Sequence, residues 1–391
     1  PQVTEELSYA LITPYSLYKS RTGGIIGRLL GSARLEFVGA RMFVFSDEFI
    51  DRYIDIVCHE DMDPTIAEAW RQYIDRHLRR SNPWGYLPRC MLMLFRGPNA
   101  VRHLKEEVIG SFTEQPMGDT VRGTYGDFLR GENGKVYYFE PACITCSKPE
   151  RVRMHFELFA DYALSDGGIL TGQIDYDADP ECSLVMLKPD NFYRRSRRPG
   201  NIIDAFSLTG LRIVGAKLFS MTVAQGERFY GPLKHIFVDK LKGNVTKEIY
   251  SRLGDAFEYP FEMDDAEHLA DRLAERNAVY EFNRIVEYMT GVNPDDVSEA
   301  EKATASKTKC LGLLYEGPNA IEKIREVLGS TDPQKAEPGT VRSDFGRDLM
   351  RNGAHASDSP ENALREREIV GLVQTENDAS DIERLIGEHT E

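Results

Sequence analysis

The sequence contains no long hydrophobic run and no recognisable targeting segment. None of its 391 residues lie in a stretch of roughly 18 apolar residues, and the first residues do not show a basic segment followed by an apolar one. We therefore expect a cytoplasmic protein without a membrane partner. Hydrophobic residues still make up 41% of the chain, which is enough for packed cores.

Basic residues are in the minority. The chain has 48 Lys and Arg against 63 Asp and Glu, which gives a formal charge of -15 at pH 7. A dedicated nucleic-acid-binding protein needs a basic surface to replace the counterions of the phosphate backbone. We therefore expect no nucleic-acid partner, although local basic clusters could still bind nucleotide phosphates.

Cysteine is scarce and scattered. Six cysteines in a chain of this length fit reduced thiols better than a disulfide framework. Cys143 and Cys146 form a C-x-x-C pair, which could be half of a zinc site or a redox pair. A second pair at ligand spacing is missing, so the sequence predicts no metal site on the protein itself.

The chain contains an internal repeat, and its length also suggests more than one domain. Both copies open with a strand, a basic loop, a G-x-I-I or G-N-I-I helix start and a V-G-A-[RK] strand. Both continue with a GPNA motif and then a T-V-R motif. The matching pairs are residues 6–44 with 183–221, 91–111 with 310–330, and 119–129 with 339–349.

The order of elements in each copy predicts the fold class. Strand–helix–strand is followed by a further strand, a helix and a last strand, as in a ferredoxin-like α+β sandwich. We predict two tandem ferredoxin-like (βαββαβ) domains with mostly antiparallel sheets. The first copy spans residues 4–165, a polar Gly-rich linker spans 166–181, and the second copy spans 182–391.

The motifs of the second copy carry a family resemblance. GPNA at 317–320, LGSTDP at 328–333, PGTVRSDFG at 338–346 and N-x-x-H-A-S-D-S at 352–359 occur in one order. In that order and nearly that spacing they resemble the nucleoside diphosphate kinase family. The resemblance implies transfer of the γ-phosphate of ATP or another nucleoside triphosphate to a nucleoside diphosphate, by a ping-pong mechanism through a phosphohistidine.

The resemblance also implies a set of catalytic residues. His355 is the nucleophile, and neutral imidazole suits this role near pH 7. The glutamate that orients its ring is Glu366 by direct spacing, or Glu368 if the following helix has two extra residues. Ser359 matches the family's serine beside the histidine, and Tyr230 matches the tyrosine near it.

Nucleotide-binding residues follow from the same alignment. Lys188, Arg325 and Arg342 match the residues that bind the phosphates, and arginine forks suit phosphate oxygens. Thr331 matches a hydroxyl that contacts the phosphates, and Asn352 matches the amide that binds the sugar. Mg²⁺ is expected to arrive with the nucleotide rather than in a protein cage.

The base-binding side departs from the family. Strict spacing places Glu281 where the family has the aromatic residue that stacks on the base, with Tyr280 and Phe282 on either side. Either neighbour could take the role. Two polar insertions, at about 235–277 and 292–309, are expected to be helical surface additions, a lid, or packing elements between the copies.

The first copy lacks the residues for phosphate transfer. Thr13 replaces the lysine, Lys105 replaces Arg325, Phe112 falls at Thr331 and Ile144 falls at the histidine. We expect it to be catalytically silent and to form an internal pseudo-dimer with the second copy, with higher homo-oligomers an open possibility. Two alternatives to the enzyme also stay open: a non-catalytic nucleotide-binding or regulatory scaffold, and a histidine phosphorelay protein.

Overall fold

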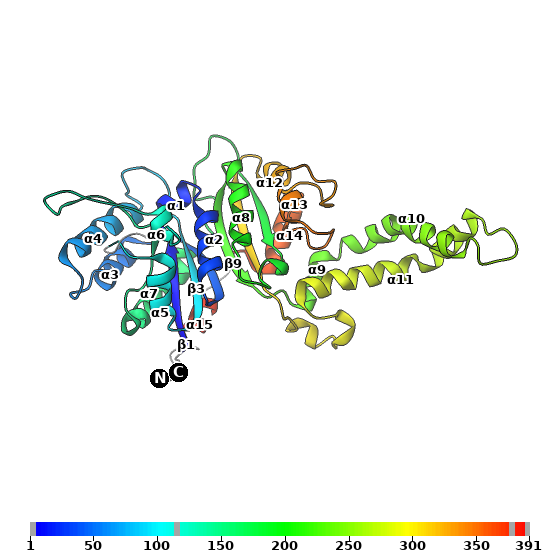
Figure 1. Cartoon of the computed structure of the whole chain (residues 1–391), viewed down its shortest axis with the longest axis horizontal. Coiled ribbons are helices and arrows are strands. Elements are labelled where there is room, and N and C mark those ends of the chain that lie inside the picture. Colours follow the sequence, from blue (N-terminus) through cyan, green and yellow to red (C-terminus); the bar gives the residue numbers. More distant parts are fainter. Residues whose placement is uncertain (1–4, 113–117, 375–379, 388–391) are drawn as a thin grey trace. The chain divides into compact units, whose positions relative to one another are not determined.

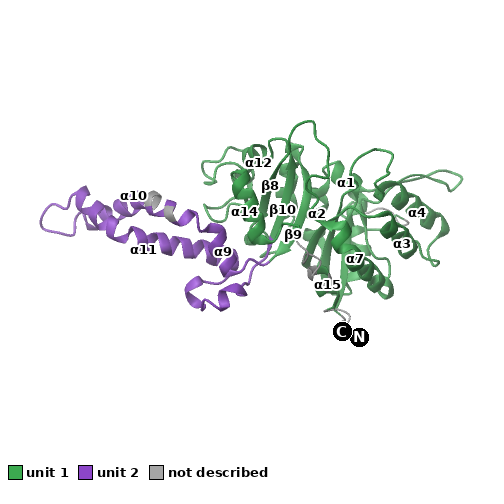
Figure 2. Ribbon diagram, turned by 180° about the vertical axis from the view of Figure 1, so that it is seen from behind, with its two compact units in different colours: residues 1–219, 311–391 green, residues 220–310 purple. Residues whose placement is uncertain are grey.

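The computed structural model describes residues 5–112, 118–374 and 380–387. Two compact units are distinguished, one formed by residues 1–219 with 311–391 and the other by residues 220–310 (Figures 1 and 2). The sheets of both sequence copies belong to the first unit. The second unit is a segment of the second copy alone, so the compact units do not coincide with the repeat.

The second copy contains a four-stranded sheet in the order β11-β8-β10-β9. Strand β8 pairs antiparallel with both β10 and β11. The elements are β8 (Glu181–Leu187), α8 (Arg198–Ala205), β9 (Arg212–Phe219), β10 (Cys310–Gly317), α12 (Ala320–Leu328) and β11 (Ala354–Ala356). This βαββαβ order confirms the predicted α+β fold with an antiparallel sheet. Further elements are η3 (Pro189–Asn191), η4 (Phe206–Thr209), α13 (Val341–Phe345) and α14 (Pro360–Val370).

The first copy repeats this connectivity. Its sheet has the order β6-β1-β3-β2, extended at the β2 edge by β7. The elements are β1 (Glu5–Ile12), α2 (Thr22–Ser32), β2 (Glu36–Phe43), β3 (Cys90–Pro98), α5 (Ala100–His103), the π-helix η1 (Leu104–Ile109), β6 (Cys143–Ile144) and β7 (Gly167–Gly168). Around them lie α1 (Pro14–Tyr18), α3 (Asp47–Val57), α4 (Pro64–Leu78), α6 (Val121–Tyr125), the β4 (Asp127–Arg130) and β5 (Val136–Glu140) hairpin, η2 (Pro149–Arg151) and α7 (Val152–Asp166).

The GPNA motif forms the same turn in both copies. Asn99 and Asn319 adopt left-handed backbone angles, with φ of 50° and 54°, a conformation that asparagine tolerates better than most residues. A glutamate from the first strand of each copy then accepts a bond from the start of the following helix, where backbone N–H groups lack helical partners. The bonds are Val101 N to Glu6 Oε2 at 3.1 Å and Ile321 N to Glu181 Oε2 at 3.2 Å.

The two copies pack against each other inside the first unit. Helices α2 and α8 lie side by side (Figure 1). A Cβ on Gly200 would lie 2.2 Å from Gly27 N, so the two helix backbones are in direct contact and only glycine fits there. The buried guanidinium of Arg89 in the first copy donates to the Ile213 carbonyl in the second.

The linker and the C-terminal helix also join the copies. Strand β7 pairs with β2 of the first copy, and Leu170 N then donates to the Val214 carbonyl of the second copy at 2.8 Å. Helix α15 (Ser380–Gly387) lies near the C-terminal end of the second copy in sequence, yet its Ile382 and Leu385 are buried in the hydrophobic core of the first copy. Burial of these side chains from water stabilises the association of the copies.

The second unit is a helical hairpin. Its elements are α9 (Val223–Tyr230), α10 (Leu233–Leu253), α11 (Met263–Thr290), η5 (Pro294–Asp296) and η6 (Glu301–Ala303). Helix α11 buries an alanine at every fourth position from Ala266 to Ala278, which lets α10 pack closely along this stripe. The insertion expected at 235–277 is therefore helical, whereas the one at 292–309 contains only short 3₁₀ turns.

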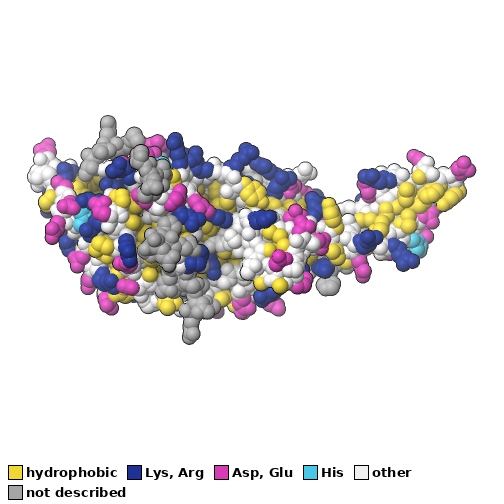
Figure 3. All heavy atoms as spheres, turned by 90° about the horizontal axis from the view of Figure 1, so that it is seen from below, with side chains coloured by type: hydrophobic (Ala, Val, Ile, Leu, Met, Phe, Trp, Pro, Cys, Tyr) yellow, Lys and Arg dark blue, Asp and Glu magenta, His cyan; other side chains and the backbone are white. Residues whose placement is uncertain are grey.

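The hairpin occupies the same place in the strand order as α3 and α4 of the first copy, between the second and third strands. Apolar atoms gather on its surface (Figure 3). Its large exposed apolar side chains include Tyr259 and Tyr280, which are each 61% exposed. Among the helices of the described residues, none combines the length and the apolar character needed to cross a lipid bilayer.

Candidate active site

His355 lies in β11, directly opposite Met186 of β8. Its Nε2 is 2.9 Å from Glu366 Oε2, and the same carboxylate oxygen accepts a bond from Ser357 Oγ at 2.7 Å. Glu366 and Ser357 are buried, whereas the His355 side chain keeps 21% of its surface exposed. A buried carboxylate thus fixes the orientation of a solvent-accessible imidazole.

The geometry distinguishes the two glutamates left open by the sequence. Glu366 faces His355 from the buried side of α14, and Glu368 is exposed. The expectation for Ser359 differs from the structure, because its hydroxyl caps α14 by accepting from Asn362 N at 3.1 Å. The serine linked to the histidine is Ser357, which sequence reasoning missed. Strand periodicity could have found it, because alternate residues of a strand point to the same face.

Lys188 lies at the end of β8 and contacts Asn352. Its Nζ donates to Asn352 Oδ1 at 2.7 Å and to the Met350 carbonyl at 3.0 Å. The amide of Asn352 in turn donates to the Thr331 carbonyl at 3.0 Å. Lys188 and Asn352 are buried, so each polar group fixes the position of the other. The structure therefore brings Lys188, Asn352 and Thr331 together in one network.

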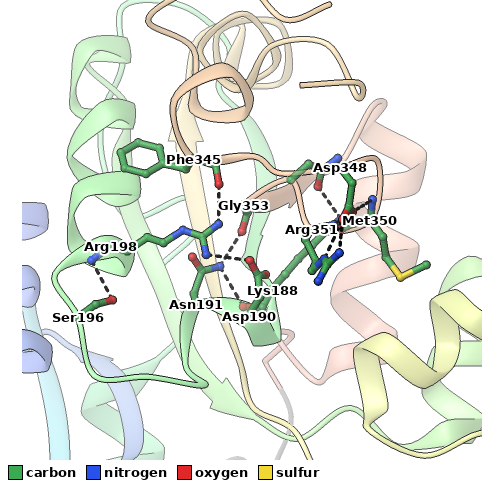
Figure 4. A network of polar contacts seen from close by, with 11 residues as sticks. Lys188, Asp190, Asn191, Ser196, Arg198, Phe345, Asp348, Met350, Arg351 and Gly353 are labelled. Atoms are coloured by element: carbon green, nitrogen blue, oxygen red, sulfur yellow. Dashed lines mark hydrogen bonds and ion pairs between the residues drawn. The ribbon is translucent and has the colours of Figure 1, made fainter. Parts of the chain in front are cut away.

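A second network lies beside Lys188 and was not predicted. Figure 4 shows Arg198 of α8 reaching Asp190, at 2.8 Å, and the Phe345 carbonyl, at 2.7 Å. Asn191 Nδ2 donates to the Gly353 carbonyl at 2.7 Å in the same view. These bonds hold the loop after β8 against the segment that precedes His355.

Arg342 joins the site through backbone carbonyls. Its Nη1 donates to the Gly329 carbonyl at 3.0 Å and lies 3.4 Å from Thr331 Oγ1, and its Nη2 is 3.5 Å from the Ala354 carbonyl, next to His355. Burial, reinforced by the nearby charge of Arg325, lowers the pKa of Arg342 to about 10. Within the described residues neither arginine forms an ion pair, so the site carries positive charge suited to an anion.

A groove of about 1060 Å³ runs beside this network. It follows α12 and the loop from 329 to 340 and reaches Asp358 at the start of α14. Among the predicted phosphate-binding residues it contains Arg325, and its wall also carries several glutamates. The groove therefore borders the site, and its mixed charge makes it a poorer anion site than the Arg342 network.

Three predicted residues belong to the second unit and are described within it. Tyr230 is buried in α9. Phe282 is buried in α11, with Lys234 Nζ 5.6 Å from its ring centroid. Tyr280 is exposed, and the Arg284 guanidinium lies 5.8 Å from its ring centroid. Of the two candidates for base stacking, Tyr280 thus has the accessible ring.

The first copy has no histidine in the equivalent position. Ile144 of β6 lies opposite Leu11 of β1, in the same register as His355 opposite Met186. Counting the same number of residues forward places His155 where the second copy has Glu366. The buried His155 bonds through Nδ1 to Tyr9 OH at 2.9 Å and serves the core.

The C-x-x-C pair consists of free, buried thiols. Burial raises the pKa of the Cys146 thiol to about 11, and that of Cys143 rises further for the same reason. Thiolate is the form that binds metal or reacts, so both thiols are in the inert form near neutral pH. In the described part of the chain no three His, Cys, Asp or Glu side chains are grouped to hold a metal ion.

Comparison with known proteins gives consistent matches. The family model described as Nucleoside diphosphate kinase matches residues 297–372. A nucleoside diphosphate kinase of Nitratiruptor is 31% identical over 186 residues, which are 48% of this chain and 91% of that protein. The enzyme of the same name from Symbiobacterium thermophilum is 30% identical over 186 residues, covering 48% of this chain and 83% of that protein.

Among solved structures, an NDP kinase from Pyrobaculum aerophilum is 26% identical and covers 49% of this chain and 95% of that chain, with a TM-score of 0.33. The two curated relatives, which are 30% and 31% identical and are matched over 83% and 91% of their lengths, establish kinship. The chain therefore belongs to the nucleoside diphosphate kinase family.

Proposed function

We propose that the second copy is an active nucleoside diphosphate kinase whose nucleophile is His355. The observation that carries this proposal is the hydrogen-bonded series Ser357–Glu366–His355, in which a buried carboxylate holds Nε2 of the imidazole. With Nε2 engaged in this way, Nδ1 is the nitrogen assigned to attack. An oriented imidazole beside two arginines and a lysine is the arrangement that phosphoryl transfer requires.

The reaction proceeds in two half-reactions. Nδ1 of neutral His355 attacks the γ-phosphorus of a nucleoside triphosphate, a P–N bond forms, and the bond to the β-phosphate oxygen breaks, so that the diphosphate leaves. A terminal oxygen of a second diphosphate then attacks the phosphorus, and the P–N bond breaks. Glu366 stabilises the positive imidazole, and Lys188, Arg325 and Arg342 offset the negative charge of the phosphates.

The proposed function implies Mg²⁺ bound with the nucleotide. A metal held mainly by phosphate oxygens needs few protein ligands, and the exposed carboxylate of Asp358 on the groove wall could contribute one of them. The ion would neutralise phosphate charge. Thr331 and Asn352 are assigned to the phosphates and sugar, Tyr280 rather than the buried Phe282 to the base, and Tyr230 to the vicinity of the histidine.

We further infer that the first copy acts as the fixed partner of the second in a pseudo-dimer. Support comes from the backbone contact between α2 and α8 and from the burial of α15 in the first copy's core. A silent copy that keeps its fold can replace a partner subunit without carrying out chemistry itself.

The test is incubation of the pure chain with γ-labelled ATP and Mg²⁺, followed by a chase with unlabelled GDP. We expect an acid-labile label that leaves as GTP. The His355→Ala variant should take up no label, whereas the matched variant at an exposed histidine, His268→Ala, should behave as the unchanged chain. Label that does not chase would favour a phosphorelay, and nucleotide binding without label would favour a scaffold; either result refutes the proposed kinase.

A further inference from the structure

The first copy contains a cavity of about 250 Å³ that phosphate transfer in the second copy does not use. Its wall comes from several separate segments, which include the turn between α3 and α4 with His59, helix α4 with Trp70, the π-helix η1 with Lys105, and the loop after β6 with Lys148. Arg122 of α6 also lines it. Segments that are far apart in the sequence thus converge on one small space.

Arg122 is a buried charge without an acidic partner among the described residues. It is 8% exposed, its Nη1 and Nη2 donate to the Gly110 and Cys143 carbonyls at 2.8 and 3.1 Å, and its Nε has no hydrogen-bond partner. Burial lowers the pKa of this guanidinium to about 10. Burying an uncompensated charge is costly, and an anion in the cavity would remove that cost.

Arg122 in the first copy and Arg342 in the second copy donate to backbone carbonyls at equivalent positions. Arg342 donates to the Gly329 and Ala354 carbonyls, which occupy the places of Gly110 and Cys143. The first copy has therefore kept a positioned guanidinium while losing the histidine. The surroundings of Arg122 differ from those of Arg342, because the Arg122 guanidinium lies 5.3 Å from the centroid of the Trp70 ring and 4.8 Å from that of the Phe112 ring.

The cavity is positive and partly apolar. Asp61 is the single carboxylate among its lining residues, and it is exposed and paired with Lys148 at 2.7 Å. Desolvation by burial lowers the pKa of His59 most, and the positive charges of Arg151, Lys148 and Lys105 lower it further. The rest of the wall is formed by apolar and aromatic side chains, which favour a ligand with an apolar or planar part. They are Val57, Met62, Ile66, Trp70 and Phe112.

Helix η1 gives this site a feature that the second copy lacks. From Asn99 to Gly110 the first copy has one residue more than the second copy has from Asn319 to Gly329. The extra residue is accommodated as the π-helix that carries Lys105. Such bulges often occur at functional sites, because they re-aim side chains at little cost to the rest of a helix.

We propose that this cavity is a binding site for a small molecule bearing a phosphate group, with the phosphate on Arg122 and Lys105 and the organic part against Trp70. No transfer chemistry follows, because Ile144 stands where a nucleophile would be needed. The same phosphate chemistry could come from inorganic phosphate or from an organic phosphomonoester, and the volume of the cavity restricts the second to compact molecules.

Trp70 provides a reporter within the site. The chain contains two tryptophans, Trp70 and Trp84, and both lie in the first copy. A Trp84→Phe variant of the full chain leaves Trp70 as the single emitter. We would titrate it with inorganic phosphate and with phenyl phosphate at constant ionic strength, with sodium chloride as the blank.

A saturable change in Trp70 emission is expected. Tighter binding of phenyl phosphate would assign the organic ester as ligand, and tighter binding of inorganic phosphate would assign the free ion; both support the site. Lys105→Gln should weaken binding at least fivefold, whereas the matched variant at an exposed lysine, Lys135→Gln, and His355→Ala should leave it unchanged. Absence of a saturable change with either probe, or binding that survives Lys105→Gln unaltered, would overturn the proposal.

Discussion

Glu366 connects the orientation of the imidazole to the rest of the site. Its carboxylate is buried and bonds both Ser357 and His355. We predict that Glu366→Gln lowers the rate of phosphate transfer on the order of 100-fold, because an amide stabilises the positive imidazole poorly and can favour the wrong tautomer. Initial rates with ATP and GDP would measure this.

Glu368→Gln is the control for that prediction. Glu368 is exposed on the same helix, so its charge is lost without any change at His355. Its rate should stay within about twofold of the unchanged chain. Equal losses in the two variants would mean that the helix, and not the hydrogen bond to His355, determines the rate.

Glu140 of the first copy makes the stability of the fold depend on pH. It is 1% exposed and accepts bonds from Thr13, Tyr73 and Ala142 N. Burial raises the pKa of this carboxyl to about 7, above its ordinary value of 4.5. The folded state therefore holds a proton that the unfolded chain releases, and stability is lost as the pH rises from 4.5 through 7.

We predict that Glu140→Gln abolishes this loss, which is worth up to about 3 kcal/mol. The measurement is the denaturation midpoint in urea between pH 5 and 8 for both chains. The unchanged chain should lose stability across this range relative to the variant, and parallel curves would refute the assignment.

Residue roles in the site were only partly predictable from the sequence. His355, Lys188, Asn352 and Arg342 were identified through motifs, and the structure brings them close together. Motif matching misplaced the serine, because Ser359 and Ser357 lie in one short S-D-S run. The choice between Ser357 and Ser359 depends on which hydroxyl faces Glu366. That depends on the geometry of the strand and not on the sequence motif.

At the level of elements, the contact between α2 and α8 leaves no room for a side chain at Gly200. A methyl group on Gly200 would overlap the backbone of α2, with Gly27 N 2.2 Å away. We predict that Gly200→Ala destabilises the first unit by about 2 kcal/mol or more, because the helices must separate. Thermal unfolding followed by circular dichroism would measure the effect.

Gly243 provides the comparison for this substitution. It also lies in a helix, α10, but a Cβ there would meet no atom within 4 Å. Gly243→Ala should be neutral or stabilising by about 0.5–1 kcal/mol, because alanine favours helix. Destabilisation of similar size in both variants would contradict the assignment of the first result to the close packing of Gly200 on Gly27.

Element types were predicted better than their details. The βαββαβ order follows from hydrophobic patterns and the repeat, and it is confirmed. The first copy has one residue more from Asn99 to Gly110 than the second copy has from Asn319 to Gly329, and the π-helix that accommodates it was not predicted. In the insertion at 292–309, which was expected to be helical, Ser298 and Glu301 make a capping contact, but only the 3₁₀ turn η6 follows, because no apolar stripe is present to stabilise a longer helix.

At the scale of the whole molecule, we predict that the copies remain associated after the linker is cut. Residues 177–180 are exposed, whereas Arg89, α2 and α15 make contacts between the copies elsewhere. A protease site placed at 177–180 and cleaved should leave both fragments in a single peak on size exclusion. Two separate peaks would contradict this and would mean that the covalent link is needed for association.

The division into compact units could not be predicted from the repeat. Sequence similarity groups residues by ancestry, and compact units follow from contacts between distant segments. The segment 220–310 is embedded in the second copy by sequence, but its helices pack mainly on each other. The copies, in contrast, share a buried contact surface and form one unit.

The linker between the copies also fixes how many sites of each kind one molecule contains. Strand β7 and Leu170 tie each second copy to one first copy of the same chain. A symmetric pair of identical subunits would carry two reactive histidines, but this chain carries one for every two folds. The ratio of the proposed transfer site to the proposed phosphate-binding site is therefore one to one in every molecule, at any expression level and any dilution.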